Sequence, residues 1–188
     1  MNKILLTAAL VTLLACNSTP SNQNTQTENQ QTLPTSTQEP VVDNSIKFDT
    51  YCNGRYGYCI DYPSAVVYPQ PESYNGDGRV FKNKKGEDVL TVFGRMNASA
   101  DGGTISLEQQ FDDDLHSVDE ENGNKDRVIT YQKLGKTFFV ISGYKKGKIF
   151  YQKTILKGDS FAYAILQYDE SEKDVFDKVS DRIFKSFK

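Results

Sequence analysis

The chain has 188 residues, with 22 basic and 25 acidic side chains, one histidine and no tryptophan. This length suits one globular domain with appended segments better than two full domains. The formal net charge of −3 and the pI near 5.3 exclude the broadly basic surface typical of nucleic-acid-binding proteins, so we expect no nucleic-acid partner. Three cysteines and one histidine leave few side chains for metal or nucleophilic chemistry, and we expect no cofactor.

The first residues have the pattern of an export signal. Lys3 gives a positive start, and residues 4–15 are apolar except for two threonines. A helix of that length reaches only about 18 Å, short of the roughly 30 Å hydrocarbon core of a bilayer. We therefore expect residues 1–15 to be a signal peptide and not a membrane-spanning helix.

The end of this segment, Leu13-Leu14-Ala15-Cys16, resembles the lipobox of bacterial lipoproteins. The resemblance implies cleavage after Ala15 and acylation of Cys16, which becomes the new N-terminus and the attachment to the membrane. More than one acyl chain anchors a protein stably, whereas a single chain binds only reversibly. The alternative is an ordinary signal peptide with an incidental cysteine. Asn17 is not aspartate, and by resemblance to enterobacterial sorting this permits passage to the outer membrane, facing the periplasm of a Gram-negative cell envelope.

Residues 16–44 are expected to be the lipidated N-terminus followed by a disordered linker. Residues 17–40 contain six threonines, five glutamines and four asparagines but a single leucine. So few apolar side chains cannot offset the entropy lost on ordering the backbone. A flexible linker of this length spans about 30 Å on average. A peptide that a partner captures is the alternative.

Residues 45–188 are expected to form one globular domain. They hold 21 basic and 22 acidic residues, so this near-neutral part should exert no strong field on phosphates or anionic lipids. Alternating apolar residues, separated by glycine turns, predict strands. The predicted strands are Ile46–Tyr51, Tyr58–Tyr62, Arg79–Lys82, Val89–Arg95, Arg127–Leu134, Lys136–Tyr144, Lys148–Lys157 and Ser160–Tyr168.

Two helices are predicted among these strands. Ser106 and Gln109 form a capping box, and an apolar stripe follows it at helical spacing. The stripe consists of Leu107, Phe111, Leu115 and Val118. The second helix, over residues 171–185, can approach the last strand closely because Ala162 and Ala164 share one face of that strand. The expected class is α+β, an antiparallel sheet with helices packed on it.

Three segments carry a resemblance to the PsbP-like superfamily. Residues 55–64, RYGYCIDYPS, resemble its opening strand, and residues 182–187, RIFKSF, resemble its closing helix. Residues 71–79 resemble a loop of uncharacterised bacterial envelope proteins. The superfamily includes DcrB-type periplasmic lipoproteins, a photosystem extrinsic protein and a Ran-binding nuclear factor. The resemblance implies a scaffold that binds other proteins, with no shared catalytic residues.

Cys52 and Cys59 flank the first predicted turn. An even number of cysteines in an exported domain favours a disulfide, here a cross-strand bridge that stabilises by about 2–3 kcal/mol. A redox pair or half of a metal site are the alternatives.

The single histidine is the main candidate for metal binding or catalysis. Asp112, His116 and Glu120 recur every four residues, which places them on one helical face where a divalent cation could bridge them. A solvated charged face is the alternative. Hydrolysis by a catalytic triad would also require His116, but the sequence has no G-x-S-x-G elbow. We expect no enzymatic activity.

Residues 75–78, NGDG, contain two consecutive turn dipeptides. The flanking Tyr68, Tyr74 and Arg79 are residue types common at interfaces, and with Asp77 they form a candidate binding loop. A purely structural turn is the alternative.

The sequence thus predicts a non-catalytic, lipid-anchored envelope protein that binds another envelope protein or acts as an accessory scaffold. A small-molecule or metal-binding periplasmic lipoprotein is the alternative. A deep apolar cavity would favour the alternative, whereas a filled core with an exposed tyrosine-rich patch would favour protein binding.

Overall fold

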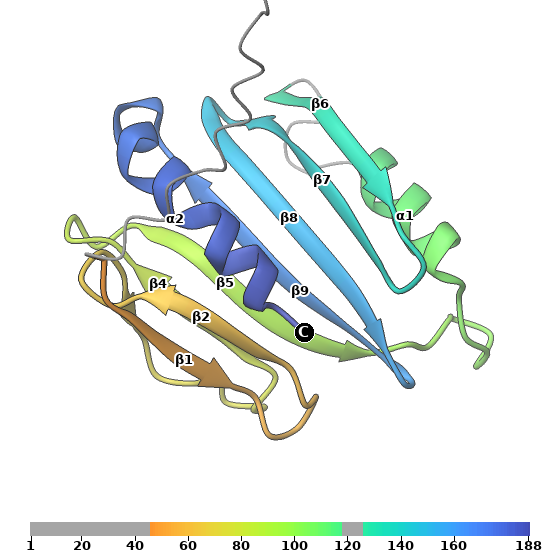
Figure 1. The fold of residues 1–188 in the computed structure, drawn as a ribbon. Helices are drawn as coiled ribbons and strands as arrows, with labels where there is room; N and C mark the ends of the chain where they lie inside the picture. The colour runs from red at the N-terminus through yellow and green to blue at the C-terminus, as the bar shows by residue number, and fades with distance from the viewer. Residues whose placement is uncertain (1–45, 118–125) are drawn as a thin grey trace, which may run out of the picture. The chain divides into compact units, whose positions relative to one another are not determined.

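The computed structural model describes residues 46–117 and 126–188 (Figure 1). The expected signal peptide, Cys16, the linker, Val118 and Glu120 lie outside these residues. Within the described part, no helix is long and apolar enough to cross a bilayer.

A seven-stranded antiparallel sheet forms the centre of the domain, with the strand order β3-β4-β5-β9-β8-β7-β6. Its strands are β3 (Tyr68–Pro69), β4 (Gly78–Lys82), β5 (Asp88–Met96), β6 (Arg127–Leu134), β7 (Phe138–Lys145), β8 (Lys148–Lys157) and β9 (Ser160–Tyr168). A separate hairpin pairs β1 (Phe48–Cys52) with β2 (Cys59–Pro63). The helices are α1 (Leu107–His116) and α2 (Lys173–Ser186), the latter preceded by the short 3-10 helix η2 (Glu170–Glu172).

Most predicted elements are present within one or two residues of their expected bounds, and the α+β class is confirmed. The two-residue strand β3 was not predicted. Ser106 accepts a hydrogen bond from the Gln109 backbone N–H, as the capping box requires. The first helix ends at His116, with Ser117 as its C-cap.

The alternation of β9 decides which helix covers which face of the sheet. Ala162 and Ala164 are buried in a core shared with α2, whereas Phe161 and Tyr163 are buried in a second core with α1. The small alanine side chains leave room for α2, as the sequence predicts. Figure 1 shows α2 and the β1–β2 hairpin on one face of the sheet and α1 on the opposite face.

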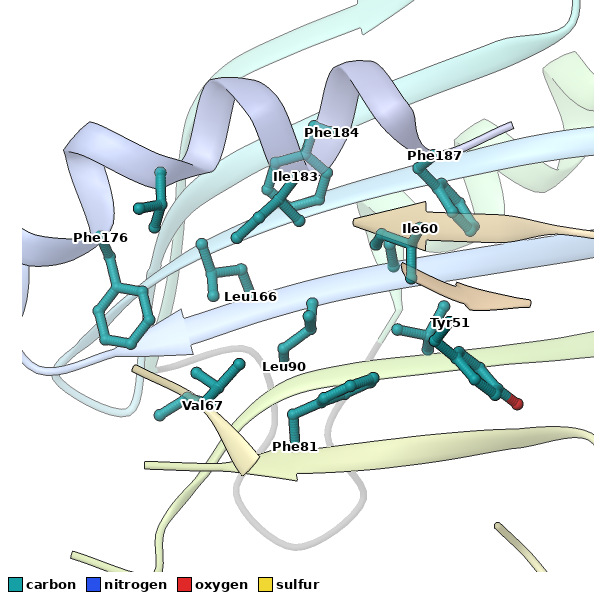
Figure 2. Packing of buried hydrophobic residues seen from close by; sticks show 14 of the residues in the cluster. Tyr51, Ile60, Val67, Phe81, Leu90, Leu166, Phe176, Ile183, Phe184 and Phe187 are labelled. Carbon is teal, nitrogen blue, oxygen red and sulfur yellow. The ribbon is translucent and has the colours of Figure 1, made fainter. Parts of the chain in front are cut away.

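The larger core lies between α2, the hairpin and the sheet. In Figure 2, Phe176, Ile183 and Phe187 extend from the α2 segment toward the sheet and the hairpin. The rings of Tyr58 and Phe187 make an edge contact at 5.7 Å between centroids. Large, fully buried aromatic side chains fill this space, and each buries an apolar area that stabilises the fold.

The C-terminus closes the outer edge of the hairpin. The Cys59 backbone N–H donates to the Lys188 carbonyl at 3.0 Å, and the Lys188 N–H donates to the Cys59 carbonyl at 3.2 Å. The Asp61 N–H donates to Ser186 Oγ at 2.8 Å. These bonds pair β2 with residues more than a hundred positions away in the sequence and so remove one exposed strand edge.

Candidate functional site

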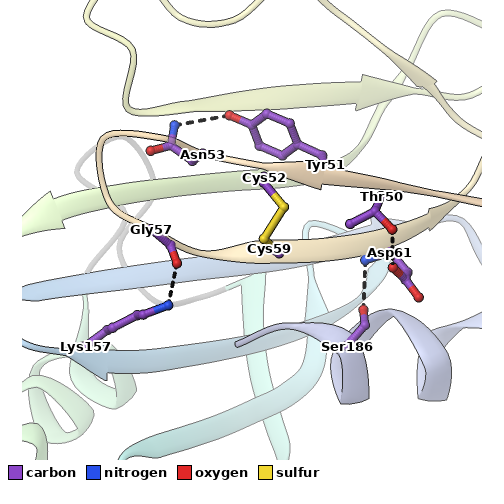
Figure 3. Close-up of a disulfide and its surroundings, with 9 residues drawn as sticks. All are labelled: Thr50, Tyr51, Cys52, Asn53, Gly57, Cys59, Asp61, Lys157 and Ser186. Carbon is purple, nitrogen blue, oxygen red and sulfur yellow. Dashed lines mark hydrogen bonds between the residues drawn. A yellow bond between two sulfur atoms is a disulfide. The ribbon is translucent and has the colours of Figure 1, made fainter.

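Cys52 and Cys59 are directly opposite each other in the β1–β2 register and form the predicted disulfide, with 4.1 Å between their Cα atoms (Figure 3). Beyond the bridge, the Lys157 ammonium donates to the Gly57 carbonyl and so ties the tip of the hairpin to β8. The disulfide therefore lies within the framework that holds the hairpin in place.

The candidate binding loop, which runs from Tyr68 to Arg79, is held against this hairpin by a buried asparagine. Asn53 is 2 % exposed, and its Nδ2 donates to Glu72 Oε1 at 3.2 Å and to the Gly76 carbonyl at 3.0 Å. Tyr51 Oη donates to the same Glu72 oxygen at 2.6 Å. Burial, followed by the bond to Glu72, raises the pKa of the Tyr51 hydroxyl. The loop is thus a fixed part of the domain surface.

The four residues predicted for this loop divide into two groups. The Asp77 carboxylate accepts hydrogen bonds from Ser73 and Asn75, and the Ser73 bond lowers the pKa of Asp77. The Arg79 guanidinium lies over the Tyr51 ring at 4.8 Å. These contacts give Asp77 and Arg79 a structural role.

Tyr68 and Tyr74 are the part of the loop that a partner could reach. The side chain of Tyr68 is 40 % exposed, and that of Tyr74 is fully exposed. A hollow of about 400 Å³ lies beside the loop, on β4 and β5. Its lining includes Gln70, Ser73, Lys82, Thr91 and Phe93.

The candidate metal face of α1 consists, in the described residues, of two exposed side chains. His116 Nδ1 lies 3.2 Å from Asp112 Oδ1 and 2.9 Å from the Asp112 carbonyl oxygen. Glu120 lies outside the described residues. An exposed i,i+4 pair of this kind is common on helices and stabilises a helix by only about 0.2–0.5 kcal/mol. The geometry matches a solvated helix face.

The opposite side of α1 carries a buried polar network that sequence reasoning missed. Gln110 Nε2 and Gln152 Nε2 each donate to the Asp114 carboxylate at 2.7 Å. Arg95 donates to the Gln110 side-chain oxygen, and Arg127 donates to the Asp114 carbonyl at 2.7 Å. Burial raises the pKa of Asp114, against the lowering effect of these donors. The network fixes α1 on the sheet and stabilises its C-terminal end.

Replacing Asp114 by asparagine is expected to change the pH dependence of stability. Because burial raises the folded-state pKa, the folded chain holds this proton more tightly than the unfolded chain does. The contribution of Asp114 to the free energy of unfolding therefore falls as pH rises from its unfolded pKa of about 3.9 through its folded pKa. Urea unfolding measures the free energy of unfolding of Asp114→Asn and of the wild-type chain. As pH rises over this range, the value for the variant should increase relative to that of the wild type. A difference that does not vary with pH would contradict the prediction.

A second polar cluster joins the β4–β5 turn to η2. Carboxylate oxygens of Glu87, Asp169 and Glu172 lie within 4.8 Å of one another. Lys148 Nζ lies 3.7 Å from Glu87 and 3.6 Å from Asp169, so an ammonium group already offsets their charge. Asn83, 6 % exposed, donates to Glu87 at 2.9 Å and to Glu172 at 3.0 Å. The cluster acts as an ion-pair network that connects distant segments.

The exposed apolar side chains that remain are concentrated on the β6 side of the sheet. We call this the β6–β7 surface and define it by three residues that are 45–56 % exposed and share one face of the sheet: Val128, Tyr131 and Tyr144. Beside it, two shallow hollows of about 320 and 220 Å³ lie between α2 and strands β7 and β8, and both are lined by Tyr151 and Ser180. Unlike the predicted loop, this surface joins residues from two strands that are neighbours in the sheet.

No protein-family model matches the sequence, and no curated protein is similar to it in sequence. The fold is similar to the solution structure of cyanobacterial PsbP (CyanoP) from Synechocystis sp. PCC 6803, with a TM-score of 0.55 and 14% sequence identity. The similarity covers 76% of this chain and 92% of that one. At this identity the comparison concerns the fold alone, and it shows that the chain contains a domain with the PsbP-like α+β fold.

Proposed function

We propose that this chain is a non-catalytic, lipid-anchored protein of the cell envelope whose PsbP-like domain binds another protein. The observation that carries the proposal is the β6–β7 surface, where Val128, Tyr131 and Tyr144 are exposed on one face of neighbouring strands. Clustered exposed apolar side chains mark interaction sites, and tyrosine is enriched at the centre of protein interfaces. The anchor at Cys16 would supply the location, and the linker the reach.

The proposed alternative is a small ligand bound in the hollows beside α2. Their walls include Phe138, Val140, Tyr151 and Phe184, with Lys153 alongside. Lys153 Nζ already donates to the Phe184 and Phe187 carbonyls at 2.7 and 2.9 Å, which stabilises the end of α2. Both hollows are open and shallow, and aromatic side chains fill the adjacent core. Protein binding is therefore the better-supported proposal.

Capture of partners from the protein's own cells tests the proposal. We expect the lipidated full chain, crosslinked in place, to recover one stoichiometric protein. The double variant Val128→Ala/Tyr131→Ala should recover about tenfold less of it, because interface aromatic residues contribute a large share of binding energy. The matched control Val175→Ala/Met96→Ala removes two exposed apolar side chains outside both the β6–β7 surface and the candidate loop and should capture normally. Failure of the wild-type chain to recover any stoichiometric protein would refute the proposal.

The anchor is tested separately by Cys16→Ser. Without the thiol, no diacylglycerol can be attached, so membrane association should fall to the level of a soluble protein. Fractionation of cells that express the variant, with intact-mass measurement of the wild-type chain, checks this. A variant that stays in the membrane fraction, or a wild-type chain that carries no acyl group, would contradict the anchoring.

A further inference from the structure

The two edges of the seven-stranded sheet differ in a way that points to the kind of partner. At one edge, β3 is only two residues long and contains Pro69, which cannot donate a backbone hydrogen bond. At the other edge, β6 has eight residues, and no other strand of the described residues pairs with its outer side. Short strands and prolines are common devices that prevent strand addition. β3 has both, whereas β6 is long enough to receive another strand.

The charge of the domain is divided between two regions. Residues 127–157, which form β6, β7 and β8, contain eight basic residues and no acidic one. The rest of residues 45–188 contains 13 basic and 22 acidic residues. The near neutrality predicted for the domain is thus the sum of a basic stretch of sequence and an acidic remainder, part of which, on α1, packs against one face of the same strands. These three strands lie side by side at the β6 end of the sheet (Figure 1), so their eight basic residues belong to that end.

Several of these basic groups have structural partners among the described residues. Lys148, Lys153 and Lys157 bind carboxylates or backbone carbonyls of other segments. Lys133 and Lys136 are exposed and make no ion pair with an acidic side chain of the described residues. Lys133 belongs to β6 itself, and Lys136 lies in the turn that joins β6 to β7. Both are available to a partner at the edge.

We propose that the partner presents an extended acidic segment that adds to β6 as an eighth strand of the sheet. The inference rests on the proposed protein-binding function and specifies the partner. Backbone hydrogen bonds along β6 would give affinity, and alternate side chains of the added strand would lie against Val128 and Tyr131, which share one face of the sheet. Its carboxylates would pair with Lys133 and Lys136 and with the field of the basic strands.

Two other occupants fit the edge less well. A second copy of this chain, paired through its own β6, would bring the exposed Lys133 and Lys136 of both copies close together, and like charges in close contact oppose association. An anionic lipid surface would satisfy the lysines, but lipid headgroups do not form the alternating donors and acceptors of a strand backbone. The outer backbone edge of β6, which no strand within residues 46–117 and 126–188 pairs with, therefore favours an acidic peptide segment.

A defined peptide tests the inference without knowledge of the natural partner. The probe is a fluorescent peptide of alternating glutamate and valine, as long as β6, added to the full chain in neutral detergent. We expect saturable binding that weakens about tenfold or more when salt rises from roughly 0.05 M to 0.5 M, because salt screens exposed charges. A peptide with prolines at alternate positions should not bind, because proline has no N–H to pair with the edge.

Charge-reversed variants identify the site. Lys133→Glu/Lys136→Glu should weaken peptide binding at least about tenfold, since two attractive contacts become repulsive. The control Lys84→Glu/Lys178→Glu makes the same charge change at exposed lysines outside residues 127–157 and should bind within about twofold of wild type. Equal loss in both pairs, or equal binding of the proline peptide, would refute strand addition at β6.

The acidic-strand inference and the proposed protein-binding function can fail separately. If cells yield a stoichiometric partner whose capture Lys133→Glu/Lys136→Glu does not reduce, the protein-binding function stands and the acidic-strand inference is wrong. If the acidic peptide does not bind but anionic phosphatidylglycerol micelles do, with the same dependence on Lys133 and Lys136, the surface is a lipid-binding site and the inference is also wrong.

Discussion

Replacement of Gly143 by alanine is expected to destabilise the domain by about 3 kcal/mol, because the new methyl group would collide with backbone and not with a movable side chain. Gly143 lies on β7, opposite the irregular part of β6. A Cβ at this position would lie 1.9 Å from the Val128 carbonyl oxygen and 3.0 Å from the Thr130 nitrogen. The two strands would have to separate there, which would disrupt the β6–β7 surface.

Urea unfolding and amide hydrogen exchange measure this effect. In Gly143→Ala, exchange should accelerate first in β6, because it is the edge strand and pairs only with β7 in the described part. Gly54→Ala is the matched control, since a Cβ added at Gly54 would meet no atom within 4 Å and the backbone there has no positive φ. The control should change the free energy of unfolding by less than about 0.5 kcal/mol. Equal stabilities of the two variants would contradict the steric argument.

Truncation of Phe176 to alanine should lower the free energy of unfolding by about 3–5 kcal/mol, through lost burial and the cavity left behind. The Phe176 side chain is 1 % exposed, and its ring stacks on that of Tyr168 with 4.8 Å between centroids. It joins the first turn of α2 to the end of β9, so the space cannot close without moving the helix.

The neighbouring Val175 provides the control for this truncation. Val175 belongs to the same turn of α2 but is 42 % exposed, and Val175→Ala should change stability by less than about 0.5 kcal/mol. Chemical unfolding of both variants is monitored by tyrosine fluorescence and far-ultraviolet circular dichroism. Comparing them separates the stability lost with a buried side chain from the stability changed by helix propensity alone. A loss in Phe176→Ala no greater than in Val175→Ala would show that the α2 core does not hold the fold.

The comparison of prediction and structure shows which interactions are local. The capping box at Ser106, the apolar stripe of α1 and the alternation of β9 each depend on residues close in sequence, so periodicity was enough to predict them. The disulfide was also predictable, because Cys52 and Cys59 flank one turn. The strand β3 was missed since two residues give no alternation to detect.

The roles of the candidate site residues depend on contacts that form only in the folded domain. The candidate loop was chosen for its residue types, but hydrogen bonds to Ser73 and a ring contact with Tyr51 give Asp77 and Arg79 structural roles. The metal face reduces to the exposed pair of Asp112 and His116 in the described residues. The signal that could have indicated the basic edge, a run from Arg127 to Lys157 without an acidic residue, was present in the sequence. Its meaning depended on the position of three strands in the sheet.

The sequence by itself determined the positions of the helices and most strands, the α+β class and the pairing of two cysteines, because short-range periodicity and turn chemistry encode them. Only the tertiary structure decided which strand lies at the open edge of the sheet and which polar side chains form hydrogen bonds or ion pairs within the domain. Asn53 with Glu72 and Asn83 with Glu172 meet only after the sheet has formed. A strand becomes an edge only through the order in which all the others pair.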